Sequence, residues 1–300
     1  MEKYIVYQID AFTKSKFKGN PAGVVVNADG LSENQMQGIA RELNNSETAF
    51  LLFPDDKSCD GQIRYFTPTT EVPTCGHATI AAMYAKAIEE KLDSCVLKIK
   101  TKIGILPFEI DRSGDNIKIW MTQGNIEIEP PLSKNIRTEL LNYLGLLHED
   151  LDNRCPVQIA STGHSKVMIG IVNKEKLNNL NPNLHQLKEL SKIINCNGYF
   201  VFTLNSNDSS VQSYGRMFAP AIGINEDPVT GNANGPLGAY LVHNKLVDTE
   251  FDSFFFRGAQ GEAIGREGIV DVLVSIQNKK PILVKIAGEA ITIFKTFIEL

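Results

Sequence analysis

Three side chains combine an acid–base group with a position that favours an unusual environment, and they are Glu47, His77 and Asp227. Glu47 precedes a strongly apolar run, AFLLF over residues 49–53, so its carboxyl group is expected to be partly buried. Burial disfavours the charged carboxylate and raises its pKa, which suits a group that carries a proton to and from carbon. A solvated glutamate at the end of a helix fits the same pattern.

The other two side chains stand where helices are expected to begin. His77 falls in the first turn of a helix predicted over about residues 77–89, where the helix dipole opposes the imidazolium and favours neutral imidazole. A capping or packing role for His77 fits as well. Asp227 precedes Pro228 at the entrance of a second helix, and it fits either a turn or cap aspartate or a second acid directed at a ligand.

The same helix starts are rich in glycine and small polar residues. Gly76 opens the first helix, and Gly231 with Asn232 opens the second. Backbone N–H groups at a helix start point outward with the dipole behind them, so they bind small anions. Gly76, Gly231 and Asn232 are therefore predicted to bind the carboxylate of a substrate.

A duplication relates the two helix starts. The stretches Arg64–Tyr84 and Arg216–Tyr240 both begin Arg-x-Phe-x-Pro, continue through a proline-containing turn and enter an apolar, alanine-rich segment. Other matches follow in the same order, with an offset that rises from 150 at Gln8 and Gln158 to 155 at the two glycines. An ordered, slowly rising offset indicates two halves of one duplicated fold.

Each half predicts several strands around one apolar helix. Ser32 and Gln35 have the spacing of a capping box, so a further helix is expected from there to about residue 43. The βαβαβ alternation of a doubly wound sheet is missing, which favours an α+β fold of two pseudo-symmetric β-barrels or rolls, each with a central helix. We expect one lobe over residues 1–124 with 290–300 and a second over 125–289, with the ligand between them.

The two halves differ in chemistry at corresponding positions. Glu47 has no carboxylate counterpart, Asp227 stands opposite Val72, and His77 stands opposite Asn232. Each half would therefore bring different groups to a shared ligand. Cys75 stands opposite Thr230, so a proton exchange between two thiols lacks one cysteine, and Cys75 is interpreted as a small packed residue.

Composition limits the class of protein. The chain has 300 residues, 43% of them hydrophobic and 22% charged, with a net charge of −5 that argues against nucleic-acid binding. Apolar runs long enough for a membrane span are missing, and the N-terminal MEKYIVYQID predicts a strand rather than a signal peptide. Five cysteines without CxxC or zinc spacing fit a reducing cytoplasm. Walker A, GxGxxG and HExxH patterns are also missing, so neither a nucleotide cofactor nor a metal is expected.

Taken together, the motifs resemble those of the phenazine-biosynthesis (PhzF-like) isomerase family. The similarity runs nearly from end to end, with every motif in order. The motifs that carry it are Asp10-Ala11-Phe12 with Gly19-Asn20-Pro21-Ala22-Gly23, residues 40–50 (ARELNNSETAF), Cys75-Gly76-His77-Ala78-Thr79 and Asp227-Pro228-Val229-Thr230-Gly231.

The resemblance implies a diaminopimelate epimerase-like fold, often as a homodimer. It implies that Glu47 is the catalytic acid/base and that His77 and Asp227 assist it. The best-understood members isomerise trans-2,3-dihydro-3-hydroxyanthranilate without a metal or cofactor. They carry a serine after Thr-Gly where this chain has Asn232, so the resemblance does not fix the substrate.

The leading hypothesis is a cofactor-independent isomerase that moves a proton between carbons of a small carboxylate-bearing metabolite. An epimerase or racemase is the first alternative, and it needs a second base opposite Glu47, for which Asp227 is the candidate. A metabolite-binding protein without catalysis is the second alternative. A cytoplasmic protein that binds neither nucleic acid nor membrane is expected in all three cases.

Overall fold

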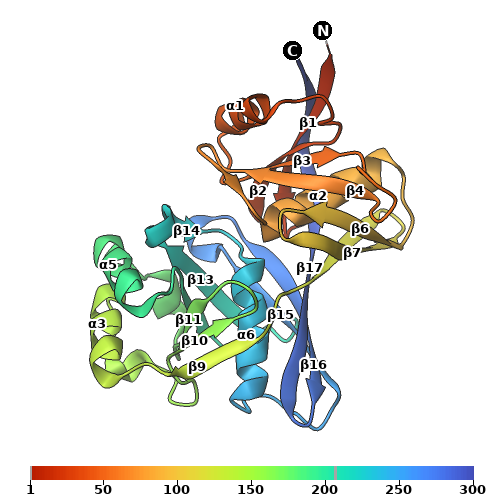
Figure 1. Cartoon of the computed structure of the whole chain (residues 1–300). Coiled ribbons are helices and arrows are strands. Elements are labelled where there is room, and N and C mark those ends of the chain that lie inside the picture. Colours follow the sequence, from red (N-terminus) through yellow and green to blue (C-terminus); the bar gives the residue numbers. More distant parts are fainter. Residues whose placement is uncertain (1, 206–207) are drawn as a thin grey trace. The chain divides into compact units, whose positions relative to one another are not determined.

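The computed structural model describes residues 2–205 and 208–300 (Figure 1). Contacts between Cα atoms divide the chain into two compact units. Unit 1 comprises Met1–Thr122 and Ala287–Leu300, and unit 2 comprises Gln123–Ile286. Within the described residues, no helix is both long and apolar enough to cross a membrane.

Unit 1 is a β-barrel around a helix. Its own strands are β1 (Lys3–Ala11), β2 (Asn20–Val25), β3 (Thr48–Leu52), β4 (Gly61–Phe66), the short β5 (Glu71–Val72), β6 (Cys95–Thr101), β7 (Gly104–Ser113) and β8 (Asn116–Thr122). β2 pairs with β3 in parallel, and so does β4 with β6. The pairs β1–β17, β1–β2, β3–β4, β4–β5, β6–β7 and β7–β8 are antiparallel. The C-terminal strand β17 (Lys280–Glu299) pairs with both β1 and β8 and closes the ring.

Two helices complete unit 1. The helix α2 (Gly76–Glu89) packs against β1, β2, β3, β7 and β8, and ten of its fourteen residues are buried (Figure 1). A helix that is apolar on most faces is stable only when strands surround it. The helix α1 (Glu33–Leu43) packs against β3 and β4 from a separate apolar cluster. Its predicted capping box is confirmed, because the Ser32 side chain accepts from the Gln35 N–H and the Gln35 side chain accepts from the Ser32 N–H.

Unit 2 repeats this plan. Its strands are β9 (Glu127–Pro131), β10 (Gln158–Ser161), β11 (Lys166–Gly170), β12 (Tyr199–Thr203), β13 (Ser213–Ala219), β14 (Ile224–Asp227), β15 (Ser253–Gln260) and β16 (Gly268–Gln277). Parallel pairing again occurs twice, between β11 and β12 and between β13 and β15. Asn278 and Lys279 both have positive φ and turn β16 into β17, as a two-residue hairpin requires.

As in unit 1, one helix of unit 2 is central and buried, and other helices pack on a separate apolar cluster. Eleven of the thirteen residues of α6 (Gly231–His243) are buried, and the helix packs against β10, β11, β15 and β16. Three further helices pack on a second apolar cluster, and they are α3 (Lys134–Leu144), α4 (Lys174–Asn178) and α5 (Leu184–Ile194). The unit also has three 3-10 turns among its described residues, η1 (His148–Asp150), η2 (Pro220–Ile222) and η3 (Glu262–Ile264).

Strand register supports the duplication and corrects one predicted match. Gln8 pairs with Gly23, and Ile159 pairs with Val167. Gly23 and Val167 are in turn the first residues of the parallel ladders to β3 and β12. The strand positions therefore relate Gln8 to Ile159, whereas matching the sequence letters related it to Gln158. A shift of one residue reverses which side chains face the core, so register decides the correspondence.

Candidate active site

Three side chains of unit 1, those of Glu47, Ser46 and Cys75, lie around the imidazole of His77. Nε2 of His77 is 3.4 Å from Glu47 Oε2 and 3.2 Å from Ser46 Oγ. Nδ1 of His77 is 3.4 Å from Cys75 Sγ. The His77 and Glu47 side chains are only 8% and 15% exposed, so the acid and the imidazole meet in a largely dry environment. The structure thus brings together two of the predicted catalytic residues.

The segment that presents Glu47 is fixed on both sides. The helix α1 ends at Asn44, whose φ of 52° lies in the left-handed region and reverses the chain toward β3. The amides of Asn45 and Gln8 exchange two hydrogen bonds of 2.9 Å, which tie this turn to β1. Thr48 then pairs with both neighbouring strands of β3. Glu47 is therefore held at the start of a central strand.

The start of α2 presents His77. The side-chain hydroxyl of Thr79 donates to the Cys75 carbonyl at 2.6 Å, and it also lies 2.6 Å from the hydroxyl of Tyr65 on β4. Burial raises the pKa of Tyr65, so this phenol stays neutral and acts as a hydrogen-bonding anchor. These bonds fix the first turn of the helix, and with it the direction of the imidazole.

The contacts of His77 favour one tautomer. A carboxylate can only accept hydrogen bonds, so the nitrogen that faces Glu47 is expected to carry the proton. Nδ1 of a neutral imidazole is then an acceptor, and the Cys75 thiol is placed to donate to it. We assign a proton to Nε2 on the basis of these partners.

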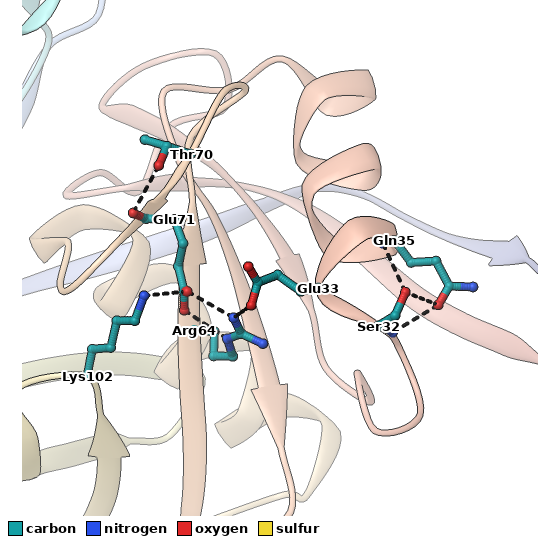
Figure 2. Close-up of polar contacts among 7 residues, drawn as sticks. All are labelled: Ser32, Glu33, Gln35, Arg64, Thr70, Glu71 and Lys102. Carbon is teal, nitrogen blue, oxygen red and sulfur yellow. Dashed lines mark hydrogen bonds and ion pairs between the residues drawn. The ribbon is translucent and has the colours of Figure 1, made fainter.

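An arginine clamp holds the segment that leads into α2. Arg64 of β4 binds Glu71 of β5 with two hydrogen bonds of 2.8 and 2.9 Å, and it also binds Glu33 of α1 at 2.7 Å (Figure 2). Lys102 binds Glu71 from the opposite side at 2.5 Å (Figure 2). The Arg64 and Lys102 charges lower the pKa of Glu71 to about 2. Glu71 stands four residues before Cys75, so the clamp limits where α2 can begin.

A second cluster surrounds Asp227 in unit 2. Asp227 ends β14, and its Oδ2 accepts a hydrogen bond from the Thr230 hydroxyl. Gln260 of β15 donates to the Asp227 carbonyl at 2.8 Å and to Thr230 Oγ1 at 3.1 Å. Asn234 of α6 donates to the side-chain oxygen of Gln260 at 3.2 Å. The Asp227 turn is thereby tied to both β15 and α6.

The arginine clamp recurs in this unit. Arg216 of β13 binds Glu226 of β14 with two hydrogen bonds of 2.9 and 2.7 Å, and Glu226 directly precedes Asp227. Here the guanidinium is buried and also donates to the carbonyls of Leu177, Asn178 and Leu180. Both clamps stack the guanidinium near a phenylalanine two residues on, at about 5 Å from the ring centre.

The predicted anion-binding residues stand at the helix starts. Gly76 is the first residue of α2, Gly231 is the first residue of α6, and the half-buried Asn232 follows it. In the part of the chain that the structure describes, neither N-cap side chain makes a capping hydrogen bond. Among the predicted residues, Glu47, His77 and Gly76 therefore lie together in unit 1, and Asp227, Gly231 and Asn232 lie together in unit 2.

The sequence pattern missed the partners of these groups. Cys75 is buried, as interpreted, but its sulfur also contacts His77. Thr230 and Gln260 were not assigned to the site. For Thr230 a signal existed in its spacing of three residues from Asp227, whereas Gln260 is brought in by the ladder between β13 and β15.

Two groups of described residues bring three possible metal ligands within 4.8 Å of one another. One is Glu47, Cys75 and His77, and the other is the surface group Asp55, Asp56 and Cys59. In the first group Cys75 Sγ lies 3.4 Å from Nδ1 of His77, and Glu47 Oε2 lies 3.4 Å from Nε2. One ion binds one ring nitrogen, so a metal at this group would use either Nδ1 or Nε2 of His77 together with Cys75 and Glu47.

Residues 9–296 match the family described as phenazine biosynthesis-like protein, PhzC-PhzF. The chain belongs to this family. An uncharacterized isomerase of Clostridium acetobutylicum is 56% identical over 296 residues, which cover 99% of this chain and 98% of that protein. The trans-2,3-dihydro-3-hydroxyanthranilate isomerase of Pseudomonas chlororaphis is 31% identical over 294 residues, 97% of each protein.

Solved structures agree with the family match. A Bacillus anthracis phenazine biosynthesis protein of the PhzF family has a TM-score of 0.89 at 32% identity, with complete coverage of both chains. A hydroxyproline epimerase from Agrobacterium vitis, with a TM-score of 0.62 at 14% identity over 99% of this chain and 93% of that chain, shares the fold alone. The predicted diaminopimelate epimerase-like α+β fold is confirmed, and so is the prediction of a PhzF-like isomerase, an enzyme that acts on a small molecule.

Proposed function

We propose that this PhzF-like isomerase acts on a small carboxylate-bearing metabolite and that Glu47 carries the proton. The Glu47 carboxylate takes a proton from one carbon of the substrate, and the electrons of that C–H bond form a new double bond. The existing double bond shifts, and Glu47 returns the proton to the carbon at its far end. Atoms and electrons balance without an oxidant, a reductant or a leaving group.

The observation that carries this proposal is the contact between Glu47 and His77. Both side chains are largely buried, and they lie 3.4 Å apart. General acid–base transfer by a positioned side chain contributes roughly 100- to 10,000-fold to a rate. His77, which donates from Nε2, would hold the Glu47 carboxylate in place for the transfer.

The substrate carboxylate would bind at a helix start. At α2 the first turn contains Gly76, where a side chain does not crowd the backbone, and the N-cap side chain points to His77 instead of capping. The N–H groups of this turn suit a carboxylate, which also gains from the helix dipole. Gly231 and Asn232 at the start of α6 keep the same predicted role in unit 2.

Deuterium exchange in D₂O tests the role of Glu47 directly. The first compound to test is trans-2,3-dihydro-3-hydroxyanthranilate, because a relative with 31% identity bears that compound in its name. A thermal-shift screen of cyclic and amino carboxylates would supply further candidates, since saturating ligands raise the melting temperature. Glu47→Gln should reduce exchange into any true substrate by at least about 100-fold while binding persists.

The chain offers a matched control for this substitution. Glu42 lies exposed on α1, five residues before Glu47, so Glu42→Gln makes the same change in the same segment and should leave exchange intact. Exchange that survives Glu47→Gln at the level of the control would exclude Glu47 as the proton carrier.

The predicted assistance by Asp227 calls for a double-variant experiment. If Asp227 and Glu47 serve one reaction, the losses caused by Glu47→Gln and Asp227→Asn will be strongly non-additive. Additive losses would assign Asp227 to a separate role. Product NMR decides the alternative of epimerisation, because an epimerase inverts one centre whereas an isomerase moves a double bond and keeps the other centres.

Two further parts of the proposal concern the protein's state in the cell. We infer a homodimer and a cytoplasmic location from the family resemblance and from the spacing of the cysteines. Sedimentation velocity at micromolar concentration gives the mass of the particle, and fractionation of cells gives the compartment. A particle of 33.2 kDa would exclude the homodimer.

A further inference from the structure

Gln260 lies at the centre of the hydrogen bonds around Asp227. It is the last residue of β15, and only 2% of its surface is exposed. Its side-chain oxygen accepts from the Thr230 backbone N–H at 3.1 Å and from Asn234 Nδ2 at 3.2 Å. Its side-chain nitrogen donates to the Asp227 carbonyl at 2.8 Å and to Thr230 Oγ1 at 3.1 Å.

These four partners fix the orientation of the Gln260 amide. Rotating the amide by 180° would set its NH₂ group against the N–H of Thr230 and would set its oxygen against the Asp227 carbonyl. Both contacts would be repulsive, so only one orientation satisfies the buried groups.

The orientation of the amide determines the hydroxyl of Thr230. Because Thr230 Oγ1 accepts a hydrogen bond from Gln260, its own proton points elsewhere, and Asp227 Oδ2 is the acceptor in reach. A hydroxyl has one proton, so the chain runs in one direction, from Gln260 through Thr230 to Asp227. Asp227 Oδ2 is thereby committed as an acceptor.

In the described part of the chain, the helix α6 lacks a side-chain capping hydrogen bond at its N-cap, Thr230. Threonine at an N-cap normally accepts a hydrogen bond from a first-turn N–H, but among the described residues the Thr230 side chain makes no such bond. The corresponding N-cap of α2, Cys75, likewise contacts His77 and does not cap. In both units the N-cap side chain binds an acid–base group in place of the helix backbone.

The strands hold the chain of hydrogen bonds in place. Gln260 pairs with Gly215 of β13, and Asp227 pairs with Met217 of the same strand. Asn234 also donates to the Thr230 carbonyl at 3.0 Å, which anchors the first turn of α6 to the same group. The donor and its final acceptor are therefore both attached to β13.

We propose that Gln260 is a positioning residue for Asp227 and acts through the Thr230 hydroxyl. The chain of hydrogen bonds holds one carboxylate oxygen as a fixed acceptor, so the Asp227 side chain keeps its rotation before a substrate arrives. The inference rests on the proposed placement of Asp227 in the active site, but the hydrogen-bond chain itself can be measured without a substrate.

The test measures the pKa of the Asp227 carboxyl group by a ¹³C NMR titration of protein that is isotope-labelled at aspartate. Hydrogen bonds to a carboxylate favour its charged form, so Thr230→Val should raise this pKa by about one unit. Thr230→Ser keeps the hydroxyl and should restore the wild-type value. Gln260→Met removes the group that directs the hydroxyl and should raise the pKa in the same direction by a smaller amount.

Other charges that act on Asp227 are the same in all variants. Among the described residues of unit 2 these charges include the partly buried Lys166, which starts β11 and whose pKa is lowered by burial, and the neighbouring Glu226, which Arg216 neutralises. Thr138→Val is the matched control, because it makes the same change on the exposed face of α3 and should leave the pKa of Asp227 unmoved.

The outcomes separate positioning from support of the fold. A pKa of Asp227 that stays at the wild-type value in both Thr230→Val and Gln260→Met, while the melting temperature falls, would overturn the proposal and leave a structural role. Should Thr230→Val fail to fold, Thr230→Ala replaces it. Deuterium exchange that survives Glu47→Gln would contradict the proposed function, but the pKa measurement on Asp227 and its interpretation would stay unchanged.

Discussion

Cys75 Sγ lies 3.4 Å from Nδ1 of His77, and Glu47 Oε2 lies 3.4 Å from Nε2 of the same ring. The two contacts place a donor on one nitrogen and an acceptor on the other, which is the pattern that selects a single neutral tautomer. A cysteine at a helix start is usually considered as a nucleophile, because the dipole favours its thiolate. The present contact gives it a different task, which is to direct the proton of its neighbour.

The first prediction concerns this task. Cys75→Ala should leave Nδ1 of His77 without its donor, so ¹⁵N NMR of histidine-labelled protein should change from one tautomer to a mixture or to the imidazolium. Exchange into a substrate should fall roughly 2- to 10-fold, since one hydrogen bond contributes about 0.5–1.5 kcal/mol. Cys75→Ser should preserve the wild-type spectrum.

A control for the cysteine itself is available in unit 2. Cys196 is buried and donates to the Gly198 carbonyl at 3.6 Å, so Cys196→Ala removes a packed thiol without touching His77. It should leave the histidine spectrum unchanged. An unaltered tautomer in Cys75→Ala would show that Glu47 alone selects it.

The second prediction compares the two arginine clamps. The Arg216 side chain is 8% exposed and binds Glu226 and three carbonyls, whereas Arg64 is 30% exposed. Breaking a buried ion pair leaves an uncompensated charge, so Arg216→Ala should cost about 3–5 kcal/mol of unfolding free energy. Arg64→Ala should cost roughly 1–2 kcal/mol, because water reaches that pair.

Urea unfolding followed by circular dichroism measures both losses. Lysine at either position keeps the charge but cannot form the two parallel hydrogen bonds, so Arg216→Lys should recover only part of the stability. Equal losses for the two alanine variants would mean that burial does not govern the strength of these clamps.

Much of the fold follows from local sequence. The starts of the central helices α2 and α6, Gly76 and Gly231, lie within one residue of prediction. Both helices could be predicted because long apolar segments without charge exclude a surface helix. The capping box at Ser32 was equally readable. The helix α3, Lys134–Leu144, was not predicted.

Tertiary relations account for the rest of the fold. The short strands β5 and β14 exist only by pairing with β4 and β13, and two to four residues carry no periodic signal. The same limit applies to the match of Gln8, where identical letters suggested a register that the strand ladders do not have.

The candidate site divides in the same way. That Glu47 and His77 would carry the chemistry was readable from residue type and position, and the structure places them in contact. Gln260 was not readable, because 33 residues separate it from Asp227 and only the parallel ladder of β13 and β15 brings them together. Groups that act directly leave a sequence signal more often than the groups that orient them.

The third prediction uses two glycines. A Cβ on Gly258 would lie 2.0 Å from the side-chain oxygen of the fully buried Asn234, so Gly258→Ala should force a shift and cost on the order of 1–3 kcal/mol. Gly38, inside α1, has open space around a Cβ, so Gly38→Ala should stabilise by about 0.5–1 kcal/mol through helix propensity and a less flexible unfolded chain. Differential scanning calorimetry of the two variants should show melting temperatures on opposite sides of the wild type.

The fourth prediction concerns acid stability. The folded pKa of Glu71 is about 2 and its ordinary value is 4.5, so the folded state binds its proton less readily than the unfolded state does. A depressed carboxyl pKa contributes stability that is fully present above about pH 4.5 and is lost as the pH falls toward 2. The contribution is on the order of 2–3 kcal/mol, and it depends on Arg64 and Lys102.

Glu71→Gln should therefore lower stability at pH 7 and flatten its decline between pH 5 and about pH 2, because the side chain that takes up the proton is gone. Urea unfolding at a series of pH values measures both effects. Glu189 forms an exposed ion pair with Lys192 on α5, and the hydrogen bond from Lys192 lowers the pKa of Glu189. Water screens this exposed pair, so Glu189→Gln is the matched control and should change the pH profile much less than Glu71→Gln. If the unfolding free energy of Glu71→Gln falls between pH 5 and about pH 2 as steeply as that of the control, the Arg64 clamp does not hold Glu71 ionised in the folded protein.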